Sequence, residues 1–85
     1  EKAIAETGPV ICKTITTAHA AFQGAVLTGN VSESLQKKEA TAWGVAQPYC
    51  ANGGYGLTSS DLILLSAQQI AILLAQKTAQ KELAK

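Results

Sequence analysis

Apolar residues recur every three or four positions over the first third of the chain. They are Ile11, Ile15, Ala18, Phe22 and Val26. This spacing places them on one face of a helix. Proline is common in the first turn of a helix and glycine just after its last residue, so Pro9 and Gly29 mark the two expected ends. The pattern therefore predicts a helix over residues 9–28.

A second helix, with a weaker apolar pattern, is expected over residues 31–47. Asn30 followed by Glu33 forms a variant of the capping box, in which two side chains satisfy free backbone N–H groups. Glu33 and Lys37 are also spaced for an ion pair along the helix. The apolar positions are Leu35, Ala42 and Val45, with Trp43 beside them. Pro48 interrupts helical hydrogen bonding and is expected to end this segment.

The third segment, residues 59–84, predicts a long C-terminal helix and is the most apolar part of the chain. Thr58 and Asp61 are spaced as a capping box at its start. Apolar residues then occupy nearly every side of the helix from Leu62 to Ala75. Three lysines follow on one face of the last turns: Lys77, Lys81 and Lys85. Lysines there complement the negative end of the helix dipole, and the same face would attract an acidic surface.

Two lengths constrain how this third helix is used. Its apolar run spans about 21 Å, which is shorter than the hydrocarbon core of a bilayer at about 30 Å. We therefore expect no transmembrane span, although contact with a membrane surface stays open. The whole helix would be about 39 Å long, whereas a compact domain of this size is about 30 Å across. The helix is thus expected either to extend beyond its own domain, where its apolar sides need a partner, or to break.

Cys12 and Cys50 are the only two cysteines of the chain. No metal-binding or redox motif surrounds them, and a single pair in 85 residues is typical of a disulfide in a small exported domain. Pairing between two chains would satisfy the same pattern. Within one chain, the bond would hold a glycine-rich loop over residues 48–57 against the first helix. The absence of methionine also fits a chain that has lost a leader peptide.

These features together predict one all-α domain over residues 1–85, built from three helices and one disulfide, in an oxidising compartment. The formal net charge is +1, and none of the seven basic residues is an arginine. Arginine is the usual residue for bidentate contacts to phosphates and bases, so nucleic acid is not the expected partner. Aromatic residues make up only 5% of the chain, which favours close helix packing over a bulky core.

Few residues are candidates for catalysis or metal binding. His19 is the single histidine, and no carboxylate lies three or four positions from it, so we interpret it as a structural helix residue. A Cys–His nucleophilic pair would need free thiols and a third, orienting group. One histidine and two distant cysteines also lack metal-ligand spacing, and the glycine-rich turn lacks the lysine of a phosphate-binding loop. We therefore expect no enzymatic activity, no metal and no other cofactor.

Three functions are compatible with this pattern. The leading hypothesis is an exported structural or interaction protein, a subunit of a larger assembly such as an extracellular filament or a membrane complex, which associates through the third helix. Its expected contact residues are Leu64, Leu65, Ile72, Leu73 and Leu83. The alternative is a carrier of a small apolar ligand or lipid held between the helices. Its expected lining is Ile15, Phe22, Trp43, Ile63 and Ile70. A weaker alternative is a secreted membrane-active toxin, for which a charge of +1 is low.

Overall fold

The computed structural model describes the backbone of residues 2–29 and 31–84 and the side chains of residues 6–29 and 31–82. Within these ranges the chain forms three α-helices and no strand. α1 spans Lys2–Thr28, α2 spans Glu33–Cys50 and α3 spans Ser59–Ala84. The predicted all-α class, the three helices and the long C-terminal helix are confirmed.

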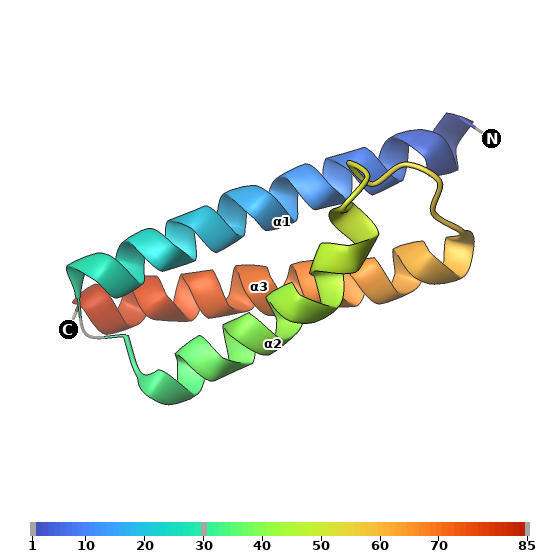
Figure 1. The fold of residues 1–85 in the computed structure, drawn as a ribbon. Helices are drawn as coiled ribbons and strands as arrows, with labels where there is room; N and C mark the ends of the chain where they lie inside the picture. Colours follow the sequence, from blue (N-terminus) through green and yellow to red (C-terminus); the bar gives the residue numbers. More distant parts are fainter. Residues whose placement is uncertain (1, 30, 85) are drawn as a thin grey trace.

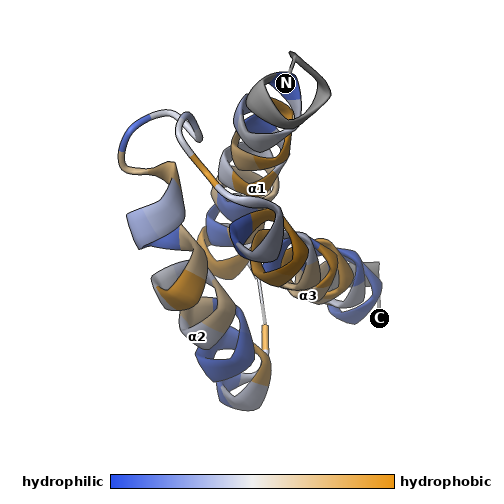
Figure 2. Ribbon diagram, turned by 90° about the vertical axis from the view of Figure 1, so that its right-hand side faces the viewer, coloured by the Kyte–Doolittle hydropathy of each residue, from blue (hydrophilic) through white to orange (hydrophobic). Residues whose placement is uncertain are grey.

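The helices pack as an elongated bundle. α1 and α3 lie side by side and run in the same direction, and α2 returns antiparallel to both (Figure 1). Seen along the bundle, the three helices occupy the corners of a triangle (Figure 2). The molecule measures 46 × 17 × 16 Å. α3 neither breaks nor extends beyond its domain, because α1 has 27 residues against the 26 of α3 and lies along it. The contrary expectation was wrong because it assumed a nearly spherical domain.

Both prolines lie inside helices rather than at their ends. α1 begins at Lys2, so Pro9 falls in its interior, and α2 continues past Pro48 to Cys50. An internal proline removes one helical hydrogen bond at a cost of about 3 kcal/mol, which tertiary contacts must offset. Cys12 and Cys50 lie within the turn that follows each proline, and they are joined by a disulfide. The disulfide therefore ties together the two segments that contain the prolines.

Ser32 caps the start of α2. Its extended backbone precedes Glu33, the first helical residue, and its side chain accepts a hydrogen bond from the backbone N–H of Leu35 at 3.3 Å. The expected capping role of Asn30 falls on a residue outside those described. The expected pair between Glu33 and Lys37 is present, with 3.8 Å between Oε1 and Nζ, and both side chains are exposed.

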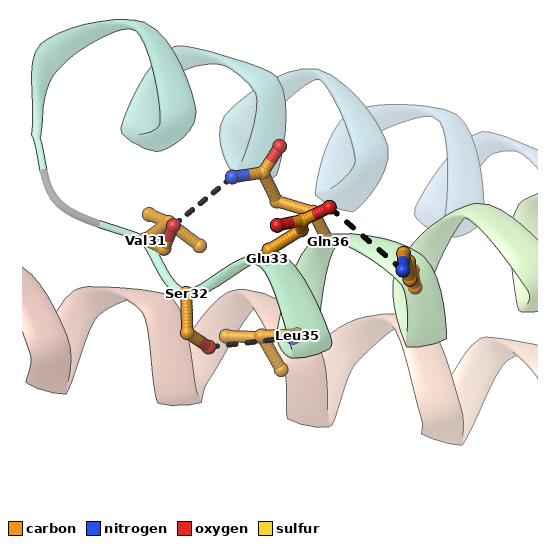
Figure 3. A network of polar contacts seen from close by, with 6 residues as sticks. Val31, Ser32, Glu33, Leu35 and Gln36 are labelled. Atoms are coloured by element: carbon orange, nitrogen blue, oxygen red, sulfur yellow. Dashed lines mark hydrogen bonds and ion pairs between the residues drawn. The ribbon is translucent and has the colours of Figure 1, made fainter.

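Two further contacts hold the start of α2 in place. Gln36 Nε2 donates to the carbonyl oxygen of Val31 at 3.0 Å, beside the cap (Figure 3). The backbone N–H of Ser32 donates to Glu82 Oε1 at 3.1 Å. Because Glu82 lies near the end of α3, this bond joins the beginning of one helix to the end of another.

The capping box predicted at the start of α3 is confirmed. The backbone N–H of Thr58 donates to Asp61 Oδ2 at 3.0 Å, and the backbone N–H of Asp61 donates to Thr58 Oγ1 at 3.1 Å. Such reciprocal bonds satisfy two backbone donors that the first turn of a helix leaves free. The start of α3 is therefore determined locally, by the sequence itself.

The predicted disulfide joins α1 to the end of α2. Cys12 and Cys50 have Cα atoms 5.6 Å apart and a sulfur–sulfur distance of 2.08 Å. The loop after Cys50 lies against α1, where the backbones of Gly8 and Gly54 touch so closely that a Cβ added to either would collide with the other's carbonyl group. Gly54 also has a φ of +86°, which favours glycine. Contact between two backbones thus fixes this loop on α1.

Alanine supplies much of the core, which forms two clusters along the bundle axis. The largest fully buried side chains are Ile15, Leu65 and Ile72. On α2 the buried positions are Glu39, Ala42 and Ala46. The stripe expected on α2 was therefore wrong at Val45, which is exposed. Alanines in the core allow the close helix approach that the composition indicates.

Candidate functional site

The most prominent surface feature is a row of exposed apolar side chains on α3, which we call the outer stripe. It consists of Ile63, Ala67, Ile70 and Leu74. Their spacing of four, three and four residues places them on one face of a helix. Ile63, Ile70 and Leu74 are 74%, 66% and 62% exposed. Scattered apolar residues are normal on a protein surface, whereas a contiguous apolar row is a candidate contact site.

The opposite side of α3 carries a second apolar row, which we call the inner seam. It consists of Leu65, Ile72, Ala75 and Ala79, all buried. α1 and α2 each pack more extensively against α3 than against one another, and together they cover this seam. α3 therefore has two apolar sides, and the described part of the molecule covers only one of them.

The structure corrects the contact residues expected on α3. Leu65 and Ile72 are fully buried in the core of their own domain, so they are not available to a partner. Leu64 and Leu73 are half-exposed and lie on either side of the outer stripe. Leu83 lies outside the residues whose side chains are described. The prediction failed at two positions because a helix that is apolar all round has no periodicity that distinguishes its inner side from its outer side.

α3 also meets a length criterion for crossing a membrane. Over the described residues, its segment Ser59–Glu82 is long and apolar enough for a span, judged by length and composition only. A mostly buried core helix of a soluble protein passes the same test, whereas only 28% of the apolar window of α3 is buried. The apolar length of α3 and the exposure of its outer stripe are thus the two properties that bear on contact with a membrane or another protein.

A polar cluster lies between α1 and α2. His19 Nδ1 is 2.7 Å from Glu39 Oε2, and the imidazole stacks on the indole of Trp43 with ring centroids 3.9 Å apart and planes within 2°. Glu39 is only 3% exposed. The two atoms share a hydrogen bond, which gives the buried carboxyl group a partner. The cluster therefore satisfies a buried acid and aligns two rings across the helix pair.

The sequence pattern did not predict this cluster, because no acid lies three or four positions from His19 within its own helix. A signal was available on the second helix. Glu39 lies four positions after Leu35 and three before Ala42, so it occupies the apolar stripe itself. An acid at a core position must find a partner, and the single histidine is an obvious candidate. Only the packing of α1 on α2 shows that the two residues meet.

An open groove of about 490 Å³ lies beside this cluster, between α1 and α2. Of the residues expected to line a ligand cavity, Phe22 and Trp43 lie on the groove wall. Ile15 is buried in the core, and Ile63 and Ile70 belong to the exposed side of α3. The predicted lining was therefore wrong at those three positions. None of the groove residues is a serine, threonine, cysteine or lysine, so the wall offers no usual nucleophile to the His19–Glu39 pair.

The remaining candidates for chemistry have structural roles or lack partners. Both cysteines are in the disulfide, so neither is a free nucleophile. Among the described residues, no group of three or more His, Cys, Asp and Glu side chains is placed to hold a metal ion. Lys77 and Lys81 are exposed near the end of α3, and Lys85 lies outside the described residues.

Comparisons with protein-family models, with curated proteins and with solved structures give no match to this chain. The geometry of α3 and of the groove is therefore the basis for a proposal about function.

Proposed function

We propose that this chain is a non-enzymatic, exported structural or interaction protein. In this proposal it is a subunit of a larger assembly, such as an extracellular filament or a membrane complex, and it associates through the outer stripe of α3. The observation that carries the proposal is the exposure of Ile63, Ile70 and Leu74 in one row. Burying a large aliphatic side chain is worth about 1.5–3 kcal/mol, so covering this row would strongly favour association.

Export is supported by the disulfide. A bond between Cys12 and Cys50 is consistent with an oxidising compartment, because cytosolic thiols are generally kept reduced. We propose secretion on this basis.

The first test is the mass of the native particle, measured by light scattering on protein purified without reductant. We expect a mass that is a multiple of 8.8 kDa. The substitution Ile70→Asp places a charge in the outer stripe and should return the particle to a monomer. Val10 is the matched control, since it is an exposed apolar residue on α1, and Val10→Asp should leave the mass unchanged. A wild-type monomer at every concentration would contradict self-association.

If the wild type is a monomer, the second candidate function gains weight. We propose it as a carrier of a small apolar ligand, and the groove beside Trp43 is the feature that favours it, because its volume is suitable for such a molecule. Trp43 is the only tryptophan, so its fluorescence reports on this groove alone. Saturable quenching or a blue shift on titration with a medium-chain fatty acid would support carriage, and a linear, non-saturating response would remove it.

A further inference from the structure

We infer that the outer stripe of α3 pairs with the outer stripe of a second copy of this chain, with the two α3 helices antiparallel. The inference rests on the proposed function, since it names the partner at the same surface. Three features of α3 carry it: the order of the residues along the stripe, the positions of the charges, and the place of α3 in the bundle.

The outer stripe is symmetric about its own midpoint. Ile63 and Leu74 lie equally far from a point between Gln68 and Gln69, and so do Ala67 and Ile70. An antiparallel copy related by a two-fold axis through this point therefore places Ile63 opposite Leu74, and Ala67 opposite Ile70. In each pair one apolar side chain therefore faces another, as a self-complementary interface requires.

The spacing of the outer stripe is also that of the contact positions of a coiled coil. Steps of four, three and four residues repeat the two core positions of a heptad. Leu64 and Leu73, which are 39% and 40% exposed, lie on the two edges of the outer stripe and would widen the contact. The paired surface is thus six apolar side chains from each copy, without a charged residue among them.

The charges select the antiparallel direction. Continuing the stripe by the same steps leads to Lys77 and Lys81, both exposed. A parallel pair in register would place each of these lysines against its own copy, and like charges that face each other are destabilising. An antiparallel pair instead places Lys77 opposite Ser60, next to Asp61. The single arrangement that buries the whole stripe without juxtaposing lysines is therefore the antiparallel one.

The position of α3 leaves this pairing unobstructed. α3 forms one corner of the triangle (Figure 2). The large residues of the outer stripe are mostly exposed, although Leu74 also borders a shallow groove between α2 and α3, whereas α1 and α2 pack on the inner seam. A pair of this kind uses the same surface twice and closes on itself. It would produce a dimer, and any larger assembly would be built from dimers through a different surface.

Cross-linking tests the direction of the pair. Protein carrying Ile63→Cys is mixed with protein carrying Leu74→Cys, oxidised mildly, and the linked peptides are identified by mass spectrometry. We expect links between positions 63 and 74. In the antiparallel pair two residues 63 would be about 16 Å apart along the axis, too far for a disulfide, whose Cβ atoms are about 4 Å apart. Dominant 63–63 and 74–74 links would overturn the antiparallel arrangement.

A charge test gives an independent answer without added cysteines. Ser60→Glu should tighten the dimer about 2- to 5-fold, because each new carboxylate faces Lys77 of the other copy. Ser60→Lys is the matched control and should loosen it by a similar factor. In a parallel pair both substitutions would place like charges together, so Ser60→Glu would loosen the dimer. Sedimentation at several concentrations measures the dissociation constants.

The outcomes separate this inference from the proposed function. If Ile70→Asp raises the dissociation constant of the dimer by at least about 10-fold and the links join positions 63 and 74, association through the outer stripe and the antiparallel pair are both supported. An assembly that Ile70→Asp disrupts but that shows parallel links leaves the proposed function and overturns the antiparallel pair. A monomer at all concentrations overturns the pair of copies. If that monomer binds vesicles of neutral and anionic lipid, and Ile70→Asp abolishes the binding, a membrane is the occupant of the stripe.

Discussion

The two sides of α3 differ in their surroundings far more than in their residues. The inner seam contains Leu65 and Ile72 and the outer stripe contains Ile63 and Ile70, and in both the residues are seven positions apart. The inner residues are fully buried, and the outer ones are mostly exposed. The inner side contributes to folding of the single chain, because α1 and α2 cover it. The outer side retains its tendency to associate, and this difference is the main clue to function.

The largest expected effect comes from truncating the two sides at matched positions. Ile72→Ala should lower the free energy of unfolding by about 2–5 kcal/mol, since it leaves a cavity in the core. Ile70→Ala, two positions away on the same helix, should change it by no more than about 0.5 kcal/mol. Urea denaturation measures both values, at a protein concentration low enough to keep the chain monomeric, because association would otherwise add to the stability that Ile70 provides. Equal losses at the two positions would mean that the outer stripe is covered within the single chain.

Removal of the disulfide tests what holds α1 and the loop on the bundle. The double variant Cys12→Ser and Cys50→Ser should lose about 3 kcal/mol of stability, because the unfolded chain regains the freedom that the cross-link removes. Reductant should lower the melting temperature of the wild type and leave that of the double variant unchanged. If reductant does not affect the wild type, the cysteines are not paired in solution.

The glycine contact between the loop and α1 offers a comparison with a matched control. Gly8→Ala should destabilise the fold by up to about 3 kcal/mol, because the new methyl group collides with the backbone of Gly54. Gly24 also lies in α1 but has nothing near its missing side chain, so Gly24→Ala should stabilise by up to about 1 kcal/mol through helix propensity. Thermal unfolding of the two variants measures the difference, and a stable Gly8→Ala would place the loop elsewhere.

The smallest expected effect concerns the contact between α1 and α2, away from both sides of α3. His19→Ala should cost about 2 kcal/mol, since it leaves the buried Glu39 without its hydrogen-bond partner. Adding Glu39→Leu should recover most of this loss, because no unsatisfied group then remains. Urea denaturation of the single and double variants measures the coupling. The mass of the native particle should be unchanged in both, and a change would connect this cluster to association.

The sequence alone determined the local features of the fold. The apolar spacing of Ile11, Ile15 and Phe22 predicted α1, and the Thr58–Asp61 capping box predicted where α3 begins. The two cysteines predicted the disulfide. Each of these depends on helix geometry or on a residue type with few uses, so a short stretch of sequence carries the information.

The limits of that information are visible at the prolines and at the start of α2. Pro9 and Pro48 are ordinary signals for helix ends, yet both lie inside helices, since tertiary contacts offset the cost of an internal proline. Ser32 caps α2, whereas the capping-box spacing predicted Asn30, which lies outside the described residues.

Only the tertiary structure decided which side of α3 is free and which residues meet across helices. Leu65 and Ile63 are both apolar, and no local pattern tells which one α1 and α2 will cover. The pairing of His19 with Glu39 likewise needs the relative position of two helices. The physical reason is the same in both cases: burial and contact between elements depend on how whole helices pack, whereas caps and helical periodicity depend on neighbouring residues alone.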